Sequence, residues 1–98
     1  MLSLDEKLSP APGILSHQSG DELVVVLPEQ GRFLVLNKTG SQVFQMMDGS
    51  RSLREIAAVL SEQYGIPVEQ AQRDVLALAS KLLERAVIIR EEVQDGLP

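Results

Sequence analysis

The sequence predicts an α+β domain in which a three-stranded antiparallel sheet precedes a three-helix winged helix-turn-helix bundle. Strand-length apolar runs separated by turn residues fill the first third of the chain. From Asn37 onward, apolar residues recur at the helical spacing of three and four. The 98 residues suit one domain, which we expect over residues 14–90, with an N-terminal arm at 1–13 and a polar C-terminal tail at 91–98.

The sheet is expected from the first 36 residues. Prolines and a glycine crowd the end of segment 1–13, so we expect this arm to be irregular. A short strand at 14–17 and a turn at 18–21 precede the β-branched run 22–27, which is typical of a strand. Pro28 to Gly31 then forms a hairpin connection, with Gly31 suited to a left-handed backbone conformation.

The third strand, from Arg32 to Leu36, carries four consecutive apolar residues. An antiparallel strand with one wet face should alternate apolar and polar residues, and this one does not. If Leu34 and Leu36 point into the core, Phe33 and Val35 point the other way. We therefore expect that something covers both faces of this strand, or that both faces are meant to be covered.

Three helices are expected next. The first spans about 41–47, and the second opens with a capping box at Ser52 and Glu55 and ends at Gly65. The third runs over about 68–86, with basic residues near its end that favour the helix dipole. A short strand or wing at 87–89 completes the pattern.

Composition argues against catalysis. The chain has no cysteine and a single histidine, His17, so thiol nucleophiles, thiolate zinc sites and multi-histidine metal sites are excluded. Its glycines lack the spacing of a phosphate-binding loop. No hydroxyl nucleophile has an evident base. We therefore predict a protein that is not an enzyme, with no catalytic residues, no cofactor and no metal.

A winged helix-turn-helix could bind DNA through its last helix, but the charges oppose this. The formal net charge is −5, and the three basic residues of the third helix are matched by three acidic ones. Aromatic residues make up only 3% of the chain, which disfavours stacking on single strands. We predict no nucleic-acid partner and keep winged-helix DNA binding as an alternative. The apolar runs are too short to span a membrane, and a cytoplasmic location is the default.

The third helix has more apolar surface than a small core needs. Its apolar residues cover an arc of roughly 160° at 100° per residue. Leu78, Ala71, Leu82 and Val75 suit the core, whereas Leu76, Ala79 and Leu83 form a shoulder beside Gln72 and Ser80. An apolar edge strand next to such a shoulder is typical of β-strand addition, in which a peptide supplies a further strand. The shoulder could instead pack on the sheet or the arm, or contact an enzyme directly as an adaptor.

The ordered residues across 22–89 resemble the PqqD-like family. The resemblance is carried by Pro28-Glu29, Leu36-Asn37, Gly40, Val43-Phe44, Asp48-Gly49, Ile56, Leu60, Tyr64, Asp74-Val75, Leu82 and Val87-Ile88. It implies a recognition element for the leader segment of ribosomally synthesised, post-translationally modified peptides (RiPPs). The resemblance places leader binding on Arg32, Phe33, Leu34, Val35, Leu36, Gln72, Arg73, Leu76, Ala79, Ser80 and Leu83.

The Gly31-Arg32-Phe33 sequence resembles the freestanding recognition proteins of lasso-peptide pathways. This implies a domain that presents the leader to a processing enzyme such as a leader peptidase. A peptide chaperone of quinone-cofactor (PQQ) synthesis is the alternative within the family. We expect a leader aromatic residue between Phe33, Val35, Leu76 and Leu83, and either a monomer or a dimer paired through the edge strand.

Overall fold

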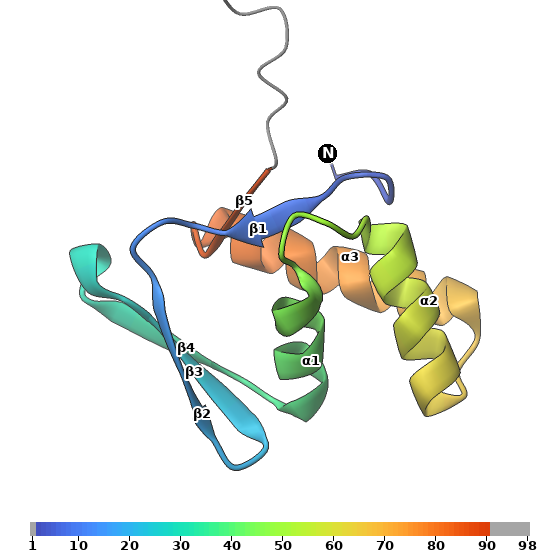
Figure 1. Ribbon diagram of the computed structural model, residues 1–98, viewed down its shortest axis with the longest axis horizontal. Helices are drawn as coiled ribbons and strands as arrows, with labels where there is room; N and C mark the ends of the chain where they lie inside the picture. Colours follow the sequence, from blue (N-terminus) through green and yellow to red (C-terminus); the bar gives the residue numbers. More distant parts are fainter. Residues whose placement is uncertain (1, 91–98) are drawn as a thin grey trace, which may run out of the picture.

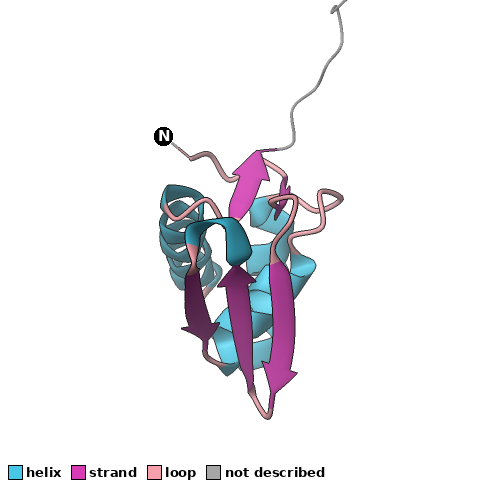
Figure 2. Ribbon diagram, turned by 90° about the vertical axis from the view of Figure 1, so that its left-hand side faces the viewer, coloured by secondary structure: helices cyan, strands magenta, loops and turns pink. Residues whose placement is uncertain are grey.

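The computed structural model describes residues 2–90, and the predicted tail at 91–98 lies outside them. A three-stranded antiparallel sheet is built from β2 (Leu15–Ser19), β3 (Glu22–Leu27) and β4 (Arg32–Leu36), in the order β2-β3-β4. Figure 1 shows this sheet beside the helices, and Figure 2 looks onto it with the helices behind. The predicted α+β class, with a sheet followed by three helices, is confirmed.

Tight turns connect the three strands. Gly20, with a φ of 62°, and Asp21 join β2 to β3. The single-turn 3₁₀ helix η1 (Pro28–Gln30) and Gly31 join β3 to β4. Gly31 has a φ of 65°, so the predicted left-handed conformation is confirmed.

The helices are α1 (Lys38–Met46), α2 (Leu53–Tyr64) and α3 (Val68–Glu84). The capping box predicted at Ser52 and Glu55 is formed, and Gly65 ends α2 in the left-handed region. Helix α1 begins three residues before the predicted start at Ser41. The side chain of Asn37 accepts a hydrogen bond of 2.8 Å from the Gly40 N–H, and this N-cap starts the helix early.

The prediction of an irregular N-terminal arm is wrong for its described part. Strand β1 (Leu8–Pro10) pairs antiparallel with β5 (Ile88–Arg90), as Figure 1 shows. The side chain of Leu8 is fully buried. The prolines do not prevent the strand, because Pro10 is the last residue of β1, where the sheet tolerates a missing N–H. A strand of three residues also shows no periodicity in the sequence.

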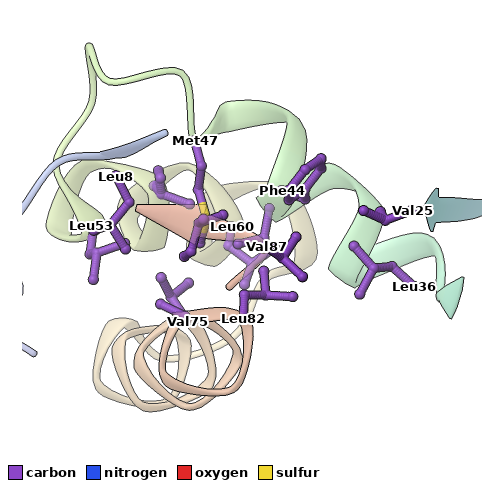
Figure 3. Packing of buried hydrophobic residues seen from close by; sticks show 14 of the residues in the cluster. Leu8, Val25, Leu36, Phe44, Met47, Leu53, Leu60, Val75, Leu82 and Val87 are labelled. Atoms are coloured by element: carbon purple, nitrogen blue, oxygen red, sulfur yellow. The ribbon is translucent and has the colours of Figure 1, made fainter. Parts of the chain in front are cut away.

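The apolar core continues from the sheet into the helices. Val25 and Leu36 of the sheet lie next to Phe44 of α1, as Figure 3 shows. The core extends from there to residues of all three helices, of β1 and of the segment before β5. It includes Leu8, Met47, Leu53, Leu60, Val75, Leu82 and Val87. Segment 2–10 thus packs on the same core as residues 14–90, whereas the winged helix-turn-helix description stays a prediction.

Replacing Leu8 with Ala tests whether the N-terminal segment is part of the fold. The buried side chain leaves a cavity, so we expect a loss of roughly 2–5 kcal/mol in the free energy of unfolding, measured by urea denaturation. The matched control is Leu15→Ala, because the Leu15 side chain is 60% exposed. Equal effects of the two substitutions would contradict the assignment of Leu8 to the core.

The free energy of unfolding should decrease at acid pH, in part because the Glu6 carboxylate becomes protonated. The Ser3 N–H and the Arg90 guanidinium both donate to its carboxylate and hold its pKa below the ordinary value of 4.5. A lowered folded-state pKa stabilises the fold above that ordinary value, and the contribution is lost as the pH falls through the folded-state pKa. Urea unfolding at a series of pH values should therefore show a smaller acid-dependent loss in Glu6→Gln than in the wild type. Identical pH profiles would contradict this.

Candidate functional site

Strand β4 is the candidate site because one of its edges is open. It pairs with β3 on one side, and none of the strands within residues 2–90 pairs with it on the other. Such an edge presents backbone N–H and C=O groups that another chain can bind. The sequence-based expectation that β4 is an edge strand is confirmed.

The hairpin between β2 and β3 determines which amides face the open edge. A two-residue turn makes Ser19 and Glu22 a hydrogen-bonded pair, and the pattern then alternates along the strands. The Gln18 side chain of β2 donates a hydrogen bond of 3.1 Å to the Glu22 carbonyl. This contact agrees with a Glu22 carbonyl that points toward β2. Residues 23, 25 and 27 therefore bond to β4. Since β4 pairs them with 36, 34 and 32, the N–H and C=O groups of Phe33 and Val35 point outward.

The side chains of β4 divide between two environments. Leu36 is buried and Leu34 packs against the core, whereas Phe33 is 67% and Val35 47% exposed on the opposite face. Within residues 2–90 nothing covers the face that carries Phe33 and Val35, so the expected cover would have to come from a partner. The expected aromatic anchor between Phe33, Val35 and α3 is incompatible with this arrangement, because the helices lie on the Leu34 side of the sheet.

A hollow of about 270 Å³ lies between the start of β4 and the end of α3. Its lining combines apolar side chains with two arginines, Arg32 and Arg85. The lining residues are Leu27, Gln30, Gly31, Arg32, Phe33, Leu34 and Arg85. Sequence reasoning included Arg32 in the site but missed Arg85, which it assigned to the helix dipole. No local pattern marks Arg85 as a lining residue, because only the packing of distant segments brings it close to the start of β4.

The predicted residues of α3 fall into three environments. Arg73 and Ser80 are exposed, and Gln72, Leu76 and Leu83 are half-buried. Ala79 is fully buried, which corrects its assignment to the groove wall. The buried stripe runs through Ala71, Val75, Ala79 and Leu82, so α3 is rotated relative to the predicted core face, and Leu78 is only partly buried.

The lowered pKa values of two acidic residues have local structural causes. The lowered pKa values of Asp48 and Glu55 arise chiefly from hydrogen bonds with Ser50 and Ser52 near the start of α2. Among residues 2–90, no cluster of three or more histidine or acidic side chains could hold a metal ion. None of the described helices is long and apolar enough to cross a membrane.

An edge strand with two outward-facing residues, beside a helix and a lined hollow, defines a domain able to accept an extended peptide. The family "Coenzyme PQQ synthesis protein D (PqqD)" matches residues 22–88. The "PqqA binding protein" of Gluconobacter oxydans (strain 621H) is 34% identical over 68 residues, which are 69% of each chain. The chain belongs to the PqqD family.

Three solved structures share the fold. "TbiB1 in Complex with the TbiA(beta) Leader Peptide" has a TM-score of 0.76 at 17% identity, covering 92% of this chain and 98% of its own. "Lasso peptide synthetase B1 complexed with the leader peptide" has a TM-score of 0.78 at 24% identity, with coverages of 85% and 98%. The PqqD part of Methylobacterium extorquens PqqCD, described as a stand-alone recognition element, gives 0.78 at 21%, with coverages of 92% and 96%. The family assignment and these structures agree on a PqqD-like fold for this chain.

Proline substitutions test the assignment of the β4 amides. Val35→Pro removes an outward N–H and should lower the free energy of unfolding by at most about 1 kcal/mol. Leu34→Pro removes a hydrogen bond to β3 and should cost about 3 kcal/mol or more. Urea denaturation of both variants measures the difference. If Val35→Pro is the more destabilising, the assignment of inward and outward amides is reversed.

Proposed function

We propose that this protein binds the leader segment of a RiPP precursor by β-strand addition to β4. The observation that carries the proposal is the open edge of β4, where the amides of Phe33 and Val35 face outward. A leader strand can pair with these groups while its alternate side chains point toward Leu34 and the helices. Main-chain bonds supply affinity in this mode, and side-chain pockets supply specificity.

Family membership and the named relatives support this function. The Gluconobacter relative is named for binding PqqA, and two of the similar structures contain leader peptides. Within this proposal, Arg32 to Leu36 form the pairing strand. The half-buried Gln72, Leu76 and Leu83 and the exposed Arg73 and Ser80 line the helix side. Ala79 supports this surface from within the core.

The proposed role is non-catalytic and needs no cofactor. Binding raises the effective concentration of the precursor near a processing enzyme such as a leader peptidase. Ordering a flexible leader opposes binding, so we expect a dissociation constant of roughly micromolar or somewhat tighter. Pairing of two copies through β4 would hide the same amides, so leader should convert such a dimer to monomer.

A lasso-peptide precursor is the proposed substrate, supported by the Gly31-Arg32-Phe33 sequence and the likeness to lasso peptide synthetase B1. The similarity to a PqqA binding protein favours a second candidate, the PQQ precursor peptide. Binding of each peptide distinguishes them. Helix α3 has two basic residues against three acidic ones, which leaves DNA binding without support.

The test is fluorescence anisotropy with labelled synthetic segments of the short peptides encoded beside this gene. At least one segment should bind the wild type. Val35→Pro should weaken this binding by about tenfold or more, because it removes a strand-pairing donor and disturbs the edge. Circular dichroism verifies that the variant remains folded.

The matched control is Ser16→Pro on the opposite edge of the sheet. Ser16 lies on β2, where the alternating pattern also directs its N–H outward, so the two variants carry the same chemical change. Ser16→Pro should bind like the wild type. Equal loss of binding in both variants would exclude β4 as the specific binding edge, and binding of no segment would exclude leader recognition.

A further inference from the structure

The hollow between β4 and α3 carries two positive charges without an acidic partner. Arg32 lies at the start of β4 and Arg85 at the C-terminal end of α3, and both are exposed. Within residues 2–90, the ion pairs join Arg54 to Asp5 and Arg90 to Glu6. The two guanidinium groups that line the hollow therefore retain donors for a ligand.

The lining favours a carboxylate over a hydrated small anion. Leu27 is 5% exposed, and Leu34 packs against the core, so part of the hollow is apolar. A charge-assisted hydrogen bond is stronger where water is partly excluded. The guanidinium group presents its donors as a planar fork that matches a carboxylate.

The surrounding acidic residues do not line this hollow. Glu29 of η1 lines a separate hollow beside Ala86, and Glu84 precedes Arg85 without contributing to the lining. Gly31 leaves the backbone beside the arginines open, since a Cβ built there meets nothing within 4 Å. A side chain entering from the open edge of β4 would thus meet two cations and no carboxylate from the lining.

We propose that this hollow binds an aspartate or glutamate side chain of the leader strand added to β4. The inference rests on the proposed function and adds a sequence requirement for the leader that binds. Arg32 and Leu34 lie on the same face of β4 and two residues apart, so their neighbours on an added strand are also two residues apart. The leader that binds carries an acidic residue two positions from an apolar residue, the first beside Arg32 and Arg85 and the second beside Leu34.

The test uses the labelled segment that binds best and its variants with each Asp or Glu changed to Asn or Gln. One such change, two positions from an apolar residue, should weaken binding by about tenfold, as expected for a charge-assisted hydrogen bond. Arg85→Gln and Arg32→Gln should each weaken binding of the original segment similarly. Neither arginine substitution should weaken binding of the neutralised segment further.

The matched control is Arg51→Gln, which removes one exposed positive charge away from the hollow. It should leave the dissociation constant within about twofold of the wild type, because Arg51 does not line the hollow and solvent and salt screen its exposed charge. Equal effects of Arg51→Gln and Arg85→Gln would overturn the site. Loss of binding in Val35→Pro with none in Arg85→Gln or Arg32→Gln would overturn it while leaving leader recognition intact. Binding of no segment would remove both proposals.

Discussion

The candidate site depends on an edge strand that is held firmly on one side and left unpaired on the other. A free strand edge invites aggregation, and proteins usually blunt it with charges, prolines or bulges. Here β4 has Arg32 at its start and Lys38 just beyond its end, with apolar residues between them. Its stability comes from the other side, where Leu34 and Leu36 pack on the core and the strand bonds to β3. That anchoring keeps the outward amides in a fixed extended conformation, which reduces the entropy cost of pairing with a peptide.

The N-terminal segment contributes to the same arrangement from a distance. After α3 the chain turns at Ala86, whose φ is 62°, and runs into β5 against β1. The Ala11 N–H donates to the Val87 carbonyl at 2.9 Å, and Arg90 pairs with Glu6 at 2.6 Å. These contacts hold the chain that follows Arg85 against the N-terminal segment. Segment 2–11, although remote from the site in sequence, thus packs against the strand that follows the helix end carrying Arg85.

Much of this fold follows from local sequence signals, whereas the site depends on contacts that such signals do not encode. The capping box at Ser52 and the left-handed glycines mark their elements because each satisfies backbone groups within a few residues. The pairing of β1 with β5 joins opposite ends of the described chain, and no periodicity predicts it. The rotation of α3, which buries Ala79 and turns Leu78 partly outward, is likewise decided by packing against the other helices. Apolar periodicity identifies the shoulder of α3 but assigns Leu78, instead of Ala79, to the core face.

The sheet has two edges, and their side chains explain why β4 is the better candidate for peptide binding. Strand β2 is exposed throughout, and its side chains are mostly polar, with Gln18 hydrogen-bonded to the adjoining turn. A peptide added there would gain main-chain bonds but little apolar contact. In the proposed mode, a peptide added to β4 would also lie against Leu34, which packs on the core, and over the hollow lined by Leu27 and Leu34. Backbone pairing exchanges bonds with water for bonds with protein and gives a modest net gain, so apolar burial must supply much of the affinity. Only β4 combines the two within the described sheet.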